Sequence, residues 1–218
     1  MSQAESAKPF SYPAMLKLKN KPCVIVGAGP VALRKLVSLG QAGAKLTVIA
    51  PEFSQEFRAA ALVYSAQLIE ALYKPEMLRG AFITIAATND FTINKQITQA
   101  APCLCNNITE PELGNFTVPA TLTQGDITAT IATAGVPAYT RILKTYLETK
   151  ITPEHAAFLD FLREVRTELK TIPSTPKERT AFWRNTLNED ILKLLEDGNL
   201  SGAKEIVLNA VTSFRTKS

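Results

Sequence analysis

A glycine-rich turn between an apolar strand and a helix constrains the fold of this chain more than any other feature. The apolar run Cys23–Val26 predicts a buried strand, and it breaks at once into Gly27–Ala32, which has the pattern Gly-x-Gly-x-x-Ala. A second apolar run, Leu46–Ala50, closes a βαβ unit of the usual length of about 30 residues. This context makes the pattern a dinucleotide fingerprint, whereas a lone Gly-x-Gly would also fit an ordinary tight turn.

A physical reason explains why each of the three small residues of the pattern is needed at its position. Gly27 lets the chain turn sharply off the strand, Gly29 leaves room for a pyrophosphate beside the backbone, and Ala32 keeps the helix close to the strand. Free amide groups at the helix start, aided by the helix dipole, would face the phosphates. We therefore predict a cofactor-binding loop made of Gly27, Ala28, Gly29, Pro30, Val31 and Ala32.

Composition excludes several classes of function. The chain has 218 residues, 46% hydrophobic and 20% charged, with a net charge of +4. No apolar run reaches the ~20 residues of a membrane helix, and the mild positive charge does not predict nucleic-acid binding. Three cysteines and a single histidine, His155, exclude a His-rich metal cage. We predict no metal site and no membrane or nucleic-acid partner, and we expect the reducing cytoplasm as the compartment.

Strands and helices alternate through the first half of the chain. After the βαβ unit come an apolar strand at Ala81–Ala87, a helix at Phe91–Ala100 capped by Asp90, and a strand at Leu104–Ile108. This order predicts an α/β fold, a Rossmann-like, doubly wound parallel sheet. Ligands of such sheets bind at the carboxyl ends of the strands. We therefore expect one crevice lined by three strand ends, at Gly27–Pro30, Ala86–Asn89 and Asn106–Glu110.

The strand ends supply further candidate cofactor contacts. Thr88 and Asn89 are equally suited to capping a helix and to touching a cofactor. The acid that usually ends the second strand is missing, since Ala50 and Pro51 stand there, but Glu52 follows and would repel a 2′-phosphate. The sequence therefore favours NAD over NADP. The predicted contacts at strand ends are Ala50, Pro51, Thr88 and Asn89; Asn106 could instead satisfy its own loop backbone, and only the family resemblance given below assigns it to the cofactor site.

The second half of the chain follows a different plan. Two β-rich runs around Gln124–Asp126 predict a hairpin, and Ala138–Lys150 predicts a helix. Further helices are expected at Glu154–Thr171, Lys177–Asp197 and Ser201–Ala210, and a short edge strand at Phe10–Leu18. The predicted domains are 1–113, dinucleotide-binding; 114–150, a β-rich dimerisation and substrate unit; and 151–218, helical.

The chain resembles the precorrin-2 dehydrogenase family, also called the sirohydrochlorin ferrochelatase or sirohaem synthase N-terminal family. The resemblance covers about residues 12–148, and the helical tail fits the family's C-terminal domain in kind. It is carried by Tyr12-Pro13, Cys23 to Ala32 with Arg34-Lys35, Val48 to Glu52, Ala86 to Asn89, Asn106, Pro111 to Phe116, Val118-Pro119, Pro137, Arg141 and Leu143.

The resemblance implies a homodimer that oxidises precorrin-2 to sirohydrochlorin with NAD, on the route to sirohaem. Some members also insert Fe²⁺ or Co²⁺ into the product. The family's catalytic Asp is replaced here by Thr109, and Glu110 beside it is the acid that could take its place. The family's serine-rich turn is here Thr133–Pro137, which lacks serine. The substrate-binding residues implied are Asn115, Phe116, Thr133, Gly135 and Pro137, and the catalytic ones Glu110 and Thr109.

Three alternatives to a simple dehydrogenase stay open. The chain could also be a ferro- or cobaltochelatase, a non-catalytic NAD-binding sensor, or another Rossmann enzyme, because fold alone does not decide. His155, early in a helix, is expected at the surface rather than at a metal. Lys144, Lys150, Arg163 and Arg166 are expected on solvated faces, where some could attract the eight carboxylates of a precorrin.

Overall fold

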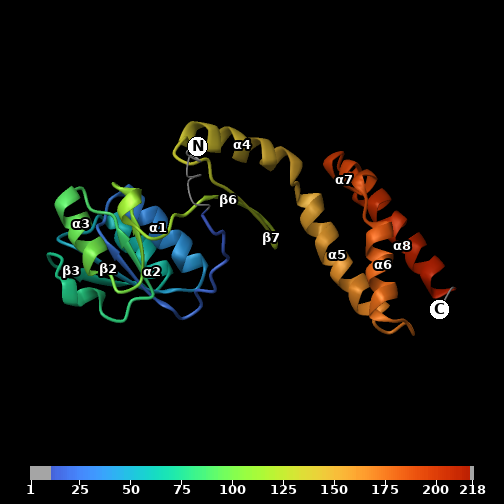
Figure 1. Ribbon diagram of the computed structural model, residues 1–218, viewed down its shortest axis with the longest axis horizontal. Helices are drawn as coiled ribbons and strands as arrows, with labels where there is room; N and C mark the ends of the chain where they lie inside the picture. Colours follow the sequence, from blue (N-terminus) through green and yellow to red (C-terminus); the bar gives the residue numbers. More distant parts are fainter. Residues whose placement is uncertain (1–10, 217–218) are drawn as a thin grey trace, which may run out of the picture. The chain divides into compact units, whose positions relative to one another are not determined.

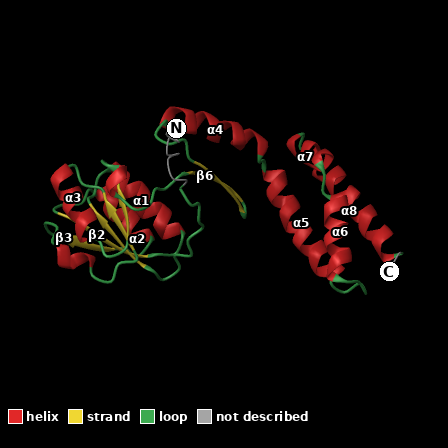
Figure 2. Cartoon of the chain, viewed as in Figure 1, coloured by secondary structure: helices red, strands yellow, loops and turns green. Residues whose placement is uncertain are grey.

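The computed structural model describes residues 11–216, and the chain divides into two compact units between Val118 and Pro119 (Figures 1 and 2). The first unit is an α/β domain and the second is a hairpin followed by helices. The elements of the first unit are β1 (Pro22–Val26), α1 (Pro30–Gln41), β2 (Lys45–Ala50), α2 (Gln55–Val63), β3 (Gln67–Glu70), the 3₁₀ helix η1 (Pro75–Leu78), β4 (Ile83–Ala86), α3 (Phe91–Ala100), β5 (Leu104–Asn107) and the 3₁₀ helix η2 (Pro111–Leu113).

The first unit is built on a five-stranded parallel sheet in the order β3-β2-β1-β4-β5, so the predicted doubly wound fold is confirmed. Strand β1 is central, and its Val26 pairs with Ile49 of β2 and Ala86 of β4. Both faces are covered, which is why the strands read as continuous apolar runs. Ile25 of β1 packs with α1 and α2, and Val26 packs on the opposite face with η1 and Ile97 of α3.

The second unit begins with the predicted hairpin. Its elements are β6 (Ala120–Gln124), β7 (Ile127–Ile131), α4 (Pro137–Lys150), α5 (Pro153–Leu169), α6 (Pro176–Thr186), α7 (Glu189–Glu196) and α8 (Leu200–Arg215). The two strands pair antiparallel. Helices α5, α6 and α7 pack against α8, whose buried residues Ala203, Val207 and Val211 recur at helical spacing.

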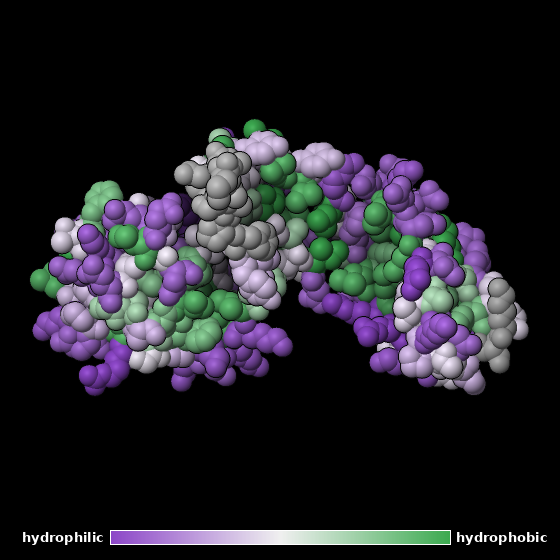
Figure 3. Space-filling model, viewed as in Figure 1, coloured by the Kyte–Doolittle hydropathy of each residue, from purple (hydrophilic) through white to green (hydrophobic). Residues whose placement is uncertain are grey.

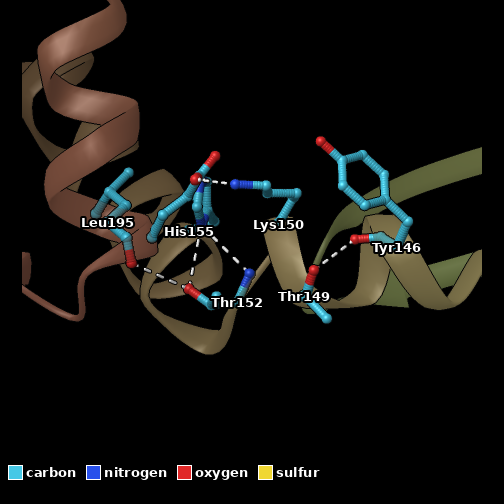
Figure 4. Close-up of polar contacts among 7 residues, drawn as sticks. Tyr146, Thr149, Lys150, Thr152, His155 and Leu195 are labelled. Atoms are coloured by element: carbon cyan, nitrogen blue, oxygen red, sulfur yellow. Dashed lines mark hydrogen bonds and ion pairs between the residues drawn. The ribbon is translucent and has the colours of Figure 1, made fainter.

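Polar contacts fix the junction between α4 and α5 (Figure 4). The Thr152 backbone N–H donates to His155 Nδ1 over 3.3 Å, and the Thr152 hydroxyl donates to the Leu195 carbonyl of α7 over 3.3 Å. At the end of α4, Lys150 Nζ lies 2.5 Å from Glu196 Oε2, and this hydrogen bond raises the pKa of the lysine. His155 therefore has a local structural role at the start of α5.

The structure corrects three boundaries predicted from the sequence. No strand forms in residues 11–18, because Tyr12 and Met15 are exposed and the segment is anchored by buried Leu18; Phe10 lies outside the described residues. The predicted helix 177–197 is two helices, because the chain becomes extended at Leu187, the C-cap of the first, and Asn188 then caps α7 by accepting from the Ile191 N–H. Helix α8 runs on to Arg215, since Val211 continues its buried face.

Candidate cofactor site

A cavity of about 1040 Å³ opens in the first unit at the carboxyl ends of the parallel strands. Its walls come from the loops after β1, β2, β3 and β4 and from the start of α3. The chain winds outward in opposite directions from β1 and β4, so this is the switch point where open α/β sheets bind ligands. The position of the cavity therefore fits a dinucleotide.

Gly27 is required by the fold at the floor of this cavity. Its φ is +114°, and a Cβ on it would lie 2.2 Å from the carbonyl oxygen of Ala87. Hydrogen bonds hold the chain in place on both sides of this close approach. Gly27 N donates to the Ile49 carbonyl of β2, and Ala87 N donates to the Val26 carbonyl of β1. Only glycine fits where the chain leaves β1 so close to the end of β4.

Gly29 is different, because nothing in its surroundings requires a glycine. It has an ordinary extended backbone, with φ −78° and ψ 178°, and no heavy atom lies within 4 Å of the position a Cβ would take. It lines the cavity and is the N-cap of α1, with no side chain capping that helix. The open space and the uncapped helix start fit a phosphate group of a dinucleotide.

The cavity brings together part of the set of cofactor contacts predicted from the sequence. Those that line it are Gly27, Ala28, Gly29, Ala50, Pro51, Thr88 and Asn89. Pro30, Val31 and Ala32 follow in the first turn of α1, where Ala32 is fully buried against the sheet. Asn106 of β5 and the loop after that strand do not line this cavity, contrary to the crevice of three strand ends expected from topology alone.

A fully buried asparagine on α3 fixes the loop after β4. Asn94 Oδ1 accepts from the Thr88 N–H over 3.0 Å and from its hydroxyl over 2.8 Å. Asn94 Nδ2 donates to the Thr88 carbonyl over 2.9 Å and to the Thr109 hydroxyl over 3.2 Å. The cap of α3 is Asp90, as predicted, whose Oδ1 accepts from Thr92 N and Ile93 N. Thr88 thus belongs to a fixed cavity wall.

The loop after β5 is held by a second buried amide, that of Asn107. Asn107 Oδ1 accepts from the Thr109 N–H, the Thr109 hydroxyl and the Glu110 N–H, over 3.0, 2.9 and 3.0 Å. Its Nδ2 donates to the Thr98 hydroxyl over 3.1 Å. The Thr109 hydroxyl is therefore committed to structure, while Glu110 is exposed.

Asn106, Asn115 and Phe116 form a third set of contacts in the first unit. Asn115 acts on the edge strand β5: its Oδ1 accepts from Cys105 N over 2.7 Å and its Nδ2 donates to the Cys103 carbonyl over 3.0 Å. Asn106 is buried and donates to the Phe116 carbonyl over 3.2 Å. Phe116 is partly buried against the main core. These side chains therefore have local partners in the structure.

The remaining predicted substrate residues, Thr133, Gly135 and Pro137, lie in the second unit. The Thr133 hydroxyl donates to the Val136 carbonyl over 2.9 Å. Ala134 and Gly135 both have positive φ, 44° and 98°, and Pro137 then begins α4. The turn is a rigid start to this helix, and its role toward a substrate stays a prediction.

The thiols of the chain are not arranged for metal or nucleophilic chemistry. Burial raises the pKa of Cys23 to about 11 and also raises the pKa of Cys105, so both stay protonated at neutral pH. Within residues 11–216, no group of three or more His, Cys, Asp or Glu side chains could hold a metal ion. In the same part of the chain no helix is long and apolar enough to cross a membrane.

Sequence reasoning missed the wall formed by the loop after β3. Ala71, Leu72 and Tyr73 line the cavity. The Tyr73 hydroxyl is buried with no hydrogen-bond partner in the described part of the chain, and burial raises its pKa. The sequence pattern of β3 is weak because the strand has only four residues, so the loop at its end was not predicted to be part of the site. The strand order places that loop beside the end of β2.

Comparison with known proteins agrees with this geometry. Residues 14–120 match a family described as "Putative NAD(P)-binding". The chain is 30% identical over 206 residues to the siroheme synthase of Methylobacillus flagellatus, covering 92% of the chain and 43% of the relative. It is 33% identical to the siroheme synthase of Psychrobacter cryohalolentis, covering 87% of the chain and 37% of the relative. The chain thus spans about two fifths of the length of these curated relatives.

A solved structure matches nearly the whole fold. SirC, a precorrin-2 dehydrogenase, superposes with a TM-score of 0.74 at 22% identity, covering 91% of this chain and all of that one. The sheet, the glycine loop and the cavity define the first unit as an NAD(P)-binding Rossmann domain. The chain is thus similar to siroheme synthases over about two fifths of their length, and it shares the fold of the solved precorrin-2 dehydrogenase.

Proposed function

We propose that this protein oxidises precorrin-2 to sirohydrochlorin with NAD⁺ in the biosynthesis of sirohaem. The observation that carries the proposal is the open space at Gly29 beside an uncapped helix start, in a chain most of which aligns with siroheme synthases. When bound, the nicotinamide supplies the hydride acceptor. The protein binds and orients the reactants, and the free thiols of Cys23, Cys103 and Cys105 fit a reducing, cytoplasmic compartment.

NAD is proposed over NADP because of the charges at the end of β2. Glu52 lines the cavity, and no lysine or arginine is among the described residues that do so. Arg58 on α2 is already paired with Glu70 and lies over the Phe53 ring. A 2′-phosphate would therefore meet a carboxylate with no free cation beside it. Calorimetric titration should give tighter binding of NAD⁺ than of NADP⁺, and Glu52→Gln should narrow the difference.

Glu110 is proposed as the proton acceptor of the reaction. Thr109 stands at the place of the family's catalytic acid, but its hydroxyl bonds to Asn94 and Asn107. The Glu110 side chain is exposed and has no hydrogen bond within residues 11–216, so no partner occupies its carboxylate. Glu110→Gln should lower kcat while NAD⁺ affinity is kept, and Glu112→Gln, two residues on, is the matched control. Equal kcat in Glu110→Gln and Glu112→Gln would show that Glu110 is not the proton acceptor.

A homodimer is proposed on the exposed apolar face of the second unit. Helix α4 has 14 residues and none is buried. Tyr139, Ile142 and Tyr146 recur at helical spacing with 54%, 63% and 58% of their surfaces exposed, and Val136 precedes them. Figure 3 shows hydrophobic surface, in green, over this helix. A stripe of this kind is typical of a protein interface. Light scattering should report a dimer that Ile142→Asp weakens and Thr145→Asp leaves intact.

The reaction is tested by incubating the protein with NAD⁺ and enzymatically made precorrin-2 while following absorbance, then adding Co²⁺. Formation of NADH and sirohydrochlorin without metal insertion is expected. Cobalt insertion after the first step would add chelatase activity to the dehydrogenase. A protein that binds NAD⁺ but gives no turnover would overturn the proposal and favour a non-catalytic sensor.

A further inference from the structure

A second cavity, of about 550 Å³, lies within the helical part of the second unit. It is a groove between α5 and α6, two helices that each pack on α8. Its lining combines four cations, Arg163, Arg166, Lys170 and Arg179, with an apolar floor that includes Leu169 and Trp183. The size falls in the range of small-molecule sites.

The positive charge is specific to this groove. Residues 151–218 contain ten lysines and arginines and ten aspartates and glutamates, so the helical part of the chain is neutral as a whole. Yet the groove is lined by four of the cations and by none of the acids. A generally basic surface therefore does not explain it, and the cluster creates a local positive potential.

Three of the four cations have no carboxylate partner. Arg163 is paired with Asp126 and Asp160, over 2.7 and 2.9 Å. Arg166, Lys170 and Arg179 have no ion-pair partner among residues 11–216. Arg179 donates to the Ser174 hydroxyl over 3.1 Å, which holds its guanidinium in place.

The spacing of two of these cations adds to the argument. Arg166 in the last turn of α5 and Lys170, the C-cap residue of that helix, are four residues apart, a spacing at which like charges repel across one helix face. An anion in the groove would relieve this repulsion. Three cations that form no ion pair around one cavity therefore favour a ligand with more than one negative charge, although Arg179 also interacts electrostatically with the neighbouring Glu178.

The apolar floor indicates what else the ligand carries. Trp183 and Leu162 are half-buried and Leu169 is fully buried, so the floor presents an indole and aliphatic side chains. Flat apolar groups pack against indole rings, while guanidinium groups bind carboxylates in a bidentate manner. We propose that the groove binds a polycarboxylate with a flat apolar body. Resting on the proposed function, that ligand is a tetrapyrrole of the kind the reaction uses, bound at a site additional to the one where hydride transfer takes place.

The chain offers its own reporter for this site. Trp183 is its single tryptophan and lines the groove. Uroporphyrin, an octacarboxylate tetrapyrrole, is a suitable probe because it is not the proposed substrate. Titrated into the full chain, it should quench the fluorescence of Trp183 in a saturable way. Because energy transfer also acts at long range, the midpoint of the titration is the readout rather than its amplitude.

Two double variants of equal charge change decide the proposal. Arg166→Gln with Lys170→Gln should weaken binding at least tenfold. Lys177→Gln with Lys193→Gln, which removes two charges outside the groove lining, should stay within twofold of wild type. Thermal melts of both variants control for folding. Equal midpoints for the two variants, or quenching that does not saturate, would overturn the site.

The outcome is separable from that of the proposed reaction. If precorrin-2 is oxidised but the groove variants bind uroporphyrin like wild type, the groove proposal fails and the reaction stands. If the groove variants lose binding but no NADH forms with precorrin-2, the polycarboxylate site stands and its identification with the reaction's tetrapyrrole fails.

Discussion

Alanine substitutions at Gly27 and Gly29 should impair different properties, because the fold requires the first glycine and the cofactor requires the second. Gly27→Ala should lower stability, and Gly29→Ala should weaken NAD⁺ binding. At Gly27 the backbone has φ +114°, and the new Cβ would lie 2.2 Å from the Ala87 carbonyl oxygen. The strained conformation costs on the order of 1–3 kcal/mol and the overpacking a similar amount. Gly27→Ala should therefore lower the free energy of unfolding by roughly 2–6 kcal/mol, a large part of the about 5–15 kcal/mol typical of a domain.

At Gly29 the same change is sterically free in the protein alone. The backbone conformation suits any residue, and no heavy atom lies within 4 Å of the new Cβ. Alanine is a poorer N-cap than glycine but restricts the unfolded chain, and these small effects oppose each other. Gly29→Ala should change the free energy of unfolding by less than about 1 kcal/mol. The methyl group would fill the space assigned to the pyrophosphate, so Kd for NAD⁺ should rise at least tenfold, about 1.4 kcal/mol.

Urea unfolding followed by circular dichroism and calorimetric titration with NAD⁺ measure the two quantities separately. The reasoning about the cofactor is refuted if Gly29→Ala is stable and binds NAD⁺ like wild type, because the phosphates then do not lie against this loop. The reasoning about the fold is refuted if Gly27→Ala unfolds at the wild-type urea concentration.

Three further predictions concern buried polar groups. Asn94→Ala leaves the N–H and carbonyl of Thr88 without partners and should cost roughly 2–4 kcal/mol in urea unfolding; a loss under about 1 kcal/mol would contradict the network. Tyr73→Phe removes a buried hydroxyl without a partner and should raise stability by up to about 1 kcal/mol; lower stability would mean that the hydroxyl has one. Asn115→Ala frees the Cys105 N–H of β5 and the Cys103 carbonyl just before it, and should cost about 1–2 kcal/mol, with a thermal melt unchanged from wild type counting against it.

The sequence predicted the parts of the fold that depend on local pattern. The turn at Gly27–Gly29 and the apolar strands on either side carry their information within a few residues, so β1, α1 and β2 followed directly. The doubly wound order followed from strict alternation. The hairpin, β6 and β7, was readable because its two β-rich runs flank Gln124–Asp126.

The parts that could not be predicted depend on side-chain amides that act across the structure. Asn107 folds the loop after β5 back on itself, and periodicity says nothing about which atoms an amide will bond. Asn188 likewise divides one helical pattern into two helices, although a cap residue before two acids was a local signal. Tyr73 entered the cavity wall only through the strand order.

Thr109, where the family resemblance implies a catalytic acid, shows how such an amide network limits which side chains fit at a position. Thr109 both donates to Asn107 Oδ1 and accepts from Asn94 Nδ2, whereas an ionised aspartate could only accept. Thr109→Asp should therefore lower the free energy of unfolding by about 1–3 kcal/mol at pH 7. The neutral carboxyl could donate to Asn107, so its pKa in the folded variant would be raised.

This raised pKa fixes the sign of the pH dependence. The loss in Thr109→Asp should be small below the ordinary aspartate pKa of about 4 and should grow as pH rises through the folded value. Thr109→Val removes both hydrogen bonds at every pH, so its loss should not vary with pH. The loss of unfolding free energy is compared between the two variants by urea unfolding from about pH 3.5 to about pH 8, which covers the titration of the carboxyl group. Parallel losses in the two variants would show that hydrogen bonding to Asn107 does not set the cost of an acid at this position, and that the network does not explain why Thr109 stands there.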